Sequence, residues 1–290
     1  MSSSAVAPLA AARKTLILIA VCLACAAMPL SFTGPAVALP SIARALGGEP
    51  VALNWVTNAF MLAFGSALLV AGALADRYGR RRVFLAGTAL FIAASIGLVY
   101  APGIVSFDWL RAAQGLGGAA IFSGGAAALA QEFDGLPRMR AFSLLGASFG
   151  AGLSFGPISS AWLIEHYGWR SIFLLVTGLA VVAFVLGARS LRESRDPDAG
   201  RLDWPGAAAF TAALALLTWG IMRVPQEGWG DPLTLSMLAG ALLLFVAFTR
   251  IELRTARPML DLTLFRYPRF VGVQWLAAAP AYAFAVSYTH

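Results

Sequence analysis

Arg111 is the residue whose type and position most strongly indicate a functional site. It stands in the apolar segment Phe107–Ala130, which is long enough to cross a bilayer. A charged side chain inside hydrocarbon is costly and usually faces a water-filled cavity or a partner. Gln114 follows three residues later, on the same face of a helix. The pair predicts a polar site within the membrane; the alternative is an interfacial arginine whose side chain reaches the headgroups.

A densely charged turn is the second candidate. It runs Gly72-Ala73-Leu74-Ala75-Asp76-Arg77-Tyr78-Gly79-Arg80-Arg81-Arg82, between two segments without charge. Charge at this density lies outside hydrocarbon, so the turn marks a membrane boundary between antiparallel neighbours. We expect Gly72 to permit a close helix approach and Gly79 to permit a tight reversal. Asp76 ends a helix and needs a cation, for which Arg77 and Arg80 are the candidates.

Four further polar residues stand in apolar segments. Ser31 and Thr33 are expected to share one cavity with Arg111. Asn54 and Asn58 give the second segment a polar, aromatic outer half, which either lines a substrate route or belongs to the interfacial aromatic belt.

The fifth apolar segment carries a stripe of small residues, at Ser148, Gly152, Gly156 and Ser160. A repeat every four residues makes a smooth face for tight helix contact. Pro157 removes one backbone donor and can bend the helix.

Composition indicates an integral membrane protein. The 290 residues are 59% hydrophobic and 12% charged, whereas soluble domains are about 25% charged. The net charge of +7 is distributed over alternate loops rather than gathered on one face, which argues against nucleic-acid binding. Cys22 and Cys25 lack further ligands nearby, so neither a metal nor a cofactor is expected. The sequence also lacks a cluster of nucleophile, base and metal ligands at one depth, which argues against an enzyme.

The apolar segments predict an all-α, multi-pass protein with eight complete spans and a ninth begun near Phe270. We expect a tail at 1–14, a six-helix unit at 15–188, a polar linker at 189–203, a hydrophobic hairpin at 204–249, a loop at 250–269 and a further helix at 270–290. The spans are expected at Thr15–Leu39, Leu53–Ala75, Val83–Tyr100, Phe107–Ala130, Ala141–Ile164, Trp169–Ala188, Trp204–Met222 and Leu233–Thr249.

Cations set the orientation. Seventeen of the 21 Lys and Arg residues fall in one set of alternate loops, three fall in the other set, and Arg111 lies within a span. By the positive-inside rule, the N-terminus and the charged turn are cytoplasmic, in the inner membrane of a cell that we expect to be bacterial.

An internal repeat relates the two halves of the six-helix unit. Leu74–Leu85 aligns with Leu163–Leu174, with matching Leu, Tyr, Gly, Arg and Phe residues, and Asp76 aligned with Glu165. The first copy follows the second span and the other follows the fifth span, on the opposite side. Three helices are therefore expected to repeat with inverted topology, as in many secondary transporters.

The charged turn resembles the signature that follows the second helix in the major facilitator superfamily. Arg111–Gly118 is similar to its fourth-helix motif, whose arginine is implicated in proton coupling, and Gly152-X-X-X-Gly156-Pro157 is similar to its antiporter motif. Gly168–Phe173, Asp203–Gly206 and Arg257–Phe265 resemble the fourteen-helix drug:proton antiporter family, in which an extra helix pair joins two six-helix halves. This resemblance implies export of drugs or other small organic molecules, coupled to protons, by a transporter of which this chain is a truncated part.

The first helix departs from that pattern, because Ser31 stands where the family usually has aspartate and Ala36 where it has asparagine. A proton carrier needs a titratable group in the cavity. This favours an uncoupled facilitator or importer as the alternative, and a membrane scaffold or sensor is a third possibility. Val286–His290 also matches the translation of a transposon adapter, so we expect these residues to be sequencing read-through.

Overall fold

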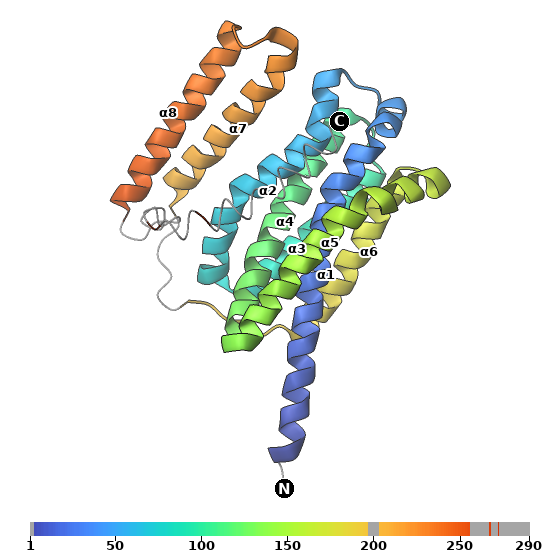
Figure 1. Cartoon of the computed structure of the whole chain (residues 1–290), viewed down its shortest axis with the longest axis vertical. Helices are drawn as coiled ribbons and strands as arrows, with labels where there is room; N and C mark the ends of the chain where they lie inside the picture. The colour runs from blue at the N-terminus through green and yellow to red at the C-terminus, as the bar shows by residue number, and fades with distance from the viewer. Residues whose placement is uncertain (1–2, 197–202, 256–266, 268–271, 273–290) are drawn as a thin grey trace.

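The protein is described by a computed structural model over residues 3–196 and 203–255, with Tyr267 and Gly272. The described residues form eight helices and no strand. Their bounds are α1 Ser3–Leu46, α2 Pro50–Tyr78, α3 Arg80–Val99, α4 Ile104–Glu132, α5 Gly135–Tyr167, α6 Arg170–Ser190, α7 Trp204–Glu227 and α8 Pro232–Arg254. Helices α1 to α6 form a bundle, and α7 and α8 form a hairpin beside it (Figure 1). The all-α multi-pass prediction is therefore confirmed.

Seven of these helices are long and apolar enough to cross a membrane, and α4 is not among them. We expected eight spans, and α4, with 29 residues at Ile104–Glu132, is a helix at the position predicted for the fourth one, Phe107–Ala130, but its composition is less apolar. Asp108, Arg111, Gln114 and several glycines dilute its apolar residues. The ninth predicted span, at 270–290, lies outside the described residues apart from Gly272.

Glycines bring α4 into backbone contact with its neighbours. A Cβ atom at Gly117 would lie 2.8 Å from the carbonyl oxygen of Gly87 on α3, and one at Gly124 would lie 2.8 Å from the Phe84 amide nitrogen. At Gly115 it would meet the carbonyl oxygen of Phe60 on α2. Small residues permit such approaches in membrane bundles. The same composition that weakens the hydropathy of α4 therefore lets it pack between α2 and α3.

The two copies of the repeat form similar turns. Gly79 separates α2 from α3 with φ of 118°, and Gly168 ends α5 with φ of 78°. Both values lie in the left-handed region that only glycine adopts without strain. Each glycine amide donates to the carbonyl four residues earlier, Ala75 or Ile164. This shared geometry supports the predicted equivalence of the two turns.

Aspartate side chains cap the N-termini of both helices of the α7–α8 hairpin. Asp203 accepts a hydrogen bond of 2.9 Å from the Gly206 amide at the start of α7. Asp231 accepts one of 2.8 Å from the Thr234 amide at the start of α8, and a second from the Thr234 hydroxyl. These bonds, together with nearby Arg223, hold the pKa of Asp231 below its ordinary value. Capped ends satisfy amides that would otherwise lack partners.

The hairpin lies against α2 through α7. The Trp55 and Trp219 rings meet edge to face with centroids 6.1 Å apart. Nearby, the Asn58 amide donates to the sulfur of Met222 at 3.3 Å. The hairpin therefore contacts the bundle at the N-terminal half of α2.

Candidate functional site

Arg111 lies at the centre of a polar cluster between α1, α2, α3 and α4. Its side chain is fully buried. Nε donates to the Val56 carbonyl oxygen on α2 at 2.7 Å, and Nη1 donates to the Ser31 hydroxyl on α1 at 3.3 Å. The guanidinium also lies 4.7 Å from the ring centroid of Phe60. These contacts place Arg111 inside the bundle, which excludes the alternative of an interfacial side chain reaching the headgroups.

Gln114 extends the cluster to α3. Its side-chain oxygen accepts from Arg111 Nη1, and its side-chain nitrogen donates to the Ser95 hydroxyl at 2.7 Å. The Ser95 hydroxyl donates in turn to the Phe91 carbonyl oxygen of its own helix at 2.6 Å. Gln114 therefore links the guanidinium of Arg111 to Ser95 of α3 by hydrogen bonds.

The groups that accept hydrogen bonds from the Arg111 guanidinium are all uncharged. Within the described residues, no carboxylate forms an ion pair with Arg111, and Nη2 is buried without a hydrogen-bond partner. Burying a cation without a counter-charge is costly, so the site is suited to accept an anionic or strongly polar group at Nη2.

Ser31 joins this cluster, but three of the other predicted residues do not. Thr33 donates to the Pro29 carbonyl oxygen on its own helix at 2.8 Å and packs beside Gly156 of α5. Asn54 is exposed, and Asn58 contacts Met222 of α7. The expected single cavity for Arg111, Ser31 and Thr33 is therefore not formed, because two residues of spacing along α1 turn Thr33 toward α5.

Three members of the cluster were not predicted from the sequence: Ser95, Phe60 and the Val56 carbonyl. Ser95 carried a usable signal, since it is one of few polar residues in the apolar run Val83–Val99. Phe60 and the Val56 carbonyl carried none, because an aromatic ring in an apolar run is ordinary and a backbone carbonyl belongs to every residue.

The charged turn forms a second polar site. Arg80 pairs with Asp76 at 3.2 Å and donates to the Gln131 side chain of α4 at 3.1 Å. Arg77, the other candidate partner of Asp76, instead stacks over the Tyr78 ring, with 5.4 Å between the guanidinium carbon and the ring centroid. Gly72 makes no close helix contact with the described residues, contrary to expectation, since a Cβ atom there would meet no atom within 4 Å.

The segment after α6 is tied to this turn. Backbone hydrogen bonds of 2.9 Å run from the Arg80 amide to the Ser194 carbonyl and from the Asp196 amide to the Asp76 carbonyl. Arg81 donates to the Ala188 carbonyl at 2.9 Å. These bonds hold the turn and the segment after α6 together, at the same end of the bundle as the Arg13–Glu132 ion pair of 2.9 Å.

The small-residue stripe of α5 packs against α1. A Cβ atom at Gly152 would lie 2.7 Å from the Ala26 carbonyl oxygen, and one at Gly156 would meet the Thr33 hydroxyl. Ser160 is buried next to Gly34 of α1, whereas Ser148 donates to its own helix at the Leu144 carbonyl. Pro157 lies within α5 beside this contact. The described contacts of the stripe are those of close helix packing.

Comparison with known proteins agrees with this architecture. The chain is 38% identical over 245 residues to the cephamycin export protein CmcT of Amycolatopsis lactamdurans, and the match covers 82% of this chain and 49% of that relative. It is 35% identical over 231 residues to the multidrug resistance protein Stp of Mycobacterium tuberculosis (strain CDC 1551 / Oshkosh), and the match covers 79% of this chain and 43% of that relative. The chain thus spans about half the length of the curated relatives it matches.

A solved structure shares the fold at low sequence identity. The crystal structure of the peptide transporter POT in complex with sulfate superposes with a TM-score of 0.61 and 17% identity, covering 83% of this chain and 53% of the other. At this identity the likeness concerns the fold alone.

The family comparison covers almost the entire chain. Residues 19–288 match the Major Facilitator Superfamily, whose members are transporters and not enzymes. The cluster around Arg111, the charged turn and the α1–α5 contact are therefore features of a transporter fold, and this chain belongs to the Major Facilitator Superfamily.

Proposed function

We propose that this chain is part of a secondary transporter that exports drugs or other small organic molecules. The observation that carries the proposal is the fully buried Arg111, held by neutral acceptors inside a helical bundle. A buried charge of this kind marks a transport pathway more often than a structural contact. The printed functions of the relatives, cephamycin export and multidrug resistance, support the substrate class.

The finer assignment is to the fourteen-helix drug:proton antiporters. In this proposal, α1 to α6 are the first half of the transporter and α7 and α8 are the extra pair that links the halves. The Asp203 cap gives the shared sequence Asp203–Gly206 a physical role, since it starts α7 where the linker meets the membrane. Alternating access then moves the two halves about a site near the midplane.

Proton coupling is part of the proposal, and uncoupled transport is the second candidate. The hydroxyl of Ser31 contacts Arg111 where a carboxylate of the family would stand. A hydroxyl does not titrate near neutral pH, so a coupled mechanism needs another carboxylate. The Ser31 contact is the observation that favours the uncoupled alternative.

Export in cells tests both candidates. The complete gene is expressed in bacteria without their own efflux pumps, and the accumulation of ethidium and puromycin is measured. We expect lower accumulation than in the vector control, and restored accumulation after a protonophore. Export that survives the protonophore supports the uncoupled candidate, and unchanged accumulation with the protein present in the membrane contradicts export of both probes.

A further inference from the structure

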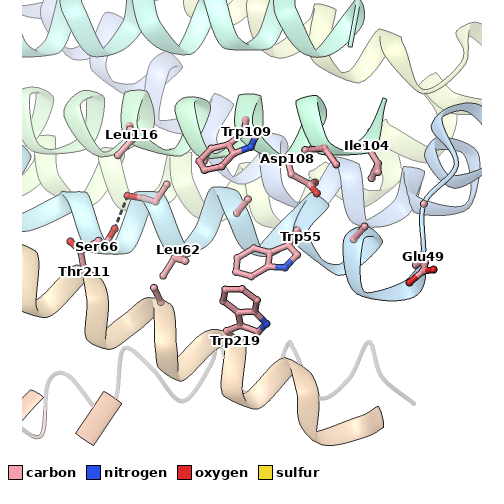
Figure 2. A pocket seen from close by; sticks show the side chains of 17 residues that line it. Glu49, Trp55, Leu62, Ser66, Ile104, Asp108, Trp109, Leu116, Thr211 and Trp219 are labelled. Atoms are coloured by element: carbon pink, nitrogen blue, oxygen red, sulfur yellow. Dashed lines mark hydrogen bonds between the residues drawn. The ribbon is translucent and has the colours of Figure 1, made fainter. Parts of the chain in front are cut away.

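A large cavity lies between α2, α4 and α7, apart from the polar cluster of Arg111. Its volume is about 820 Å³, within the range of sites for drug-sized ligands. Figure 2 shows Trp55 and Trp219 on one side and Asp108 and Trp109 on the α4 side. Leu62, Leu116 and Ser66 line the opposite end from Glu49.

Three tryptophan side chains line this otherwise mostly aliphatic cavity. Trp55, Trp109 and Trp219 come from three different helices and all line the cavity. Trp109 is 74% exposed and Trp219 is 47% exposed, so their rings are accessible to a ligand. Indole faces attract cations that lie within about 6 Å of the ring centroid.

The ionisable side chains of the lining are both acidic. Asp108 and Glu49 line the cavity, and neither lysine nor arginine is among its lining residues in the part of the chain that the structure describes. Asp108 Oδ1 is shielded from solvent without a hydrogen-bond partner among the described residues. A buried carboxylate oxygen without a partner is costly, and a cation in the cavity would supply that partner.

Arg111 does not supply this partner, although it lies three residues from Asp108 on the same helix. Its guanidinium is turned toward Val56, Ser31 and Gln114, and Arg111 is not among the lining residues. Arg111 and Asp108 therefore form no ion pair, and the Asp108 carboxylate faces the cavity.

We propose that the cavity between α2, α4 and α7 binds an organic cation with aromatic groups. The cationic centre pairs with Asp108 beside Trp55 and Trp109, and the aromatic groups extend along Leu62 and Leu116. An organic anion of the same shape lacks an attractive partner in this cavity and meets the two carboxylates. This inference concerns binding alone and does not depend on the export proposed above.

Two ions of one shape and opposite charge test the proposal. Binding of tetraphenylphosphonium and of tetraphenylborate to the full chain in lipid nanodiscs is measured by equilibrium dialysis, with empty nanodiscs subtracted. We expect saturable binding of the cation, and only non-saturable partitioning of the anion. Saturable binding of both ions with similar affinity, or of neither, would overturn the proposal.

Matched variants locate the bound cation. Asp108→Asn keeps the side-chain shape and removes the charge, and we expect it to weaken tetraphenylphosphonium binding at least about tenfold, since a carboxylate–cation contact away from bulk water is strong. Asp134→Asn is the control, because Asp134 is exposed beyond the far end of α4 and caps no helix amide with its side chain. Equal affinities of the two variants would contradict a role for Asp108.

Two further variants keep the test open if Asp108→Asn fails to fold. Trp109→Leu removes one exposed indole, and we expect about threefold weaker binding. Ala215→Phe fills the cavity from α7 and is expected to abolish saturable binding. Retained full affinity in both folded variants would place the cation elsewhere and refute the proposal.

Discussion

At the scale of residues, the neutral partners of Arg111 decide how it can act. A carboxylate partner would neutralise the guanidinium, whereas the hydrogen-bond partners of Arg111 among the described residues are the neutral groups of Ser31, Val56 and Gln114. We therefore expect the positive charge to be available to a substrate or to a group brought in during a transport cycle.

Replacing Ser31 with aspartate would change this balance. Ser31→Asp places a carboxylate beside Arg111 Nη1, where the hydroxyl now accepts at 3.3 Å. We expect transport by this variant to gain a steeper dependence on pH, because a titratable group then joins the cluster. Ser31→Asn, which is polar and does not titrate, is the control and should leave the pH profile of the parent. Identical profiles for the aspartate and asparagine variants would show that the two positions are not coupled.

The sequence identified the centre of this cluster but only part of its membership. Arg111 and Gln114 were predictable, because a charge in an apolar run and its neighbour three residues later must share a helix face. Thr33 was expected in the same cavity, yet it lies beside Gly156 of α5. Asn54 and Asn58 were expected to line a substrate route or to belong to the aromatic belt, and they are exposed and in contact with Met222 of α7, respectively. The rotation of α1 and α2 about their axes depends on packing against other helices, which hydropathy alone does not specify.

At the scale of elements, the close contact between α1 and α5 depends on glycines of α5, which have no side chain. Gly152 lies against the Ala26 carbonyl and Pro29, so Gly152→Val would force α5 away from α1. We expect a loss of about 1–3 kcal/mol in the free energy of unfolding, as for other overpacked contacts. The measurement is denaturant unfolding of the purified protein in detergent.

Gly146→Val is the matched control for that variant. A Cβ atom at Gly146 on the same helix would meet no described atom within 4 Å. Gly146→Val therefore changes the helix propensity as Gly152→Val does, but it introduces no clash. The two variants should therefore differ in stability. Equal stabilities would show that the α1–α5 contact tolerates a side chain at Gly152.

The charged turn is expected to control the conformational equilibrium rather than to contact substrate. Asp76 pairs with Arg80, which reaches Gln131 of α4, and the Asp76 carbonyl accepts from the Asp196 amide. Asp76→Asn removes the ion pair while keeping the backbone bond. We expect slow or absent transport with substrate binding retained, measured by efflux and by equilibrium binding. Lost binding in a folded variant would contradict this role, and Asp134→Asn should be without effect.

The helices themselves were largely predictable, since long apolar runs bounded by charge have few alternatives in a membrane. Helix α4 was predicted at Phe107–Ala130 and is present at Ile104–Glu132, but hydropathy did not indicate that its glycines allow contact with Gly87, Phe84 and Phe60. The docking of the segment after α6 onto the charged turn was not predictable either. It rests on backbone hydrogen bonds to Ser194 and Asp196, which carry no sequence signal.

At the scale of the whole molecule, the arginine-rich ends of the helices gather on one side. The N-terminus and the turn between α4 and α5 lie at one end of the bundle, and the turns after α1 and α7 lie toward the other (Figure 1). The positive-inside rule then predicts a cytoplasmic N-terminus.

Cysteine labelling in intact cells tests this orientation. Arg138→Cys and Gln226→Cys both stand at exposed positions, on the predicted cytoplasmic and external sides. We expect a membrane-impermeant maleimide to modify position 226 and to spare position 138 until the cells are permeabilised. The native thiols of Cys22 and Cys25, in α1, set the background in the parent protein. The reverse labelling pattern would overturn the topology.

The central claim is that Arg111 serves transport through its charge, and three substitutions in the complete gene test it. Efflux of ethidium and puromycin is measured for Arg111→Lys, Arg111→Ala and the exposed control Arg138→Ala, at matched amounts of protein in the membrane. We predict partial efflux for the lysine variant, background efflux for the alanine variant and full efflux for the control. Full efflux by Arg111→Ala would contradict the account, because the cluster would then serve packing alone.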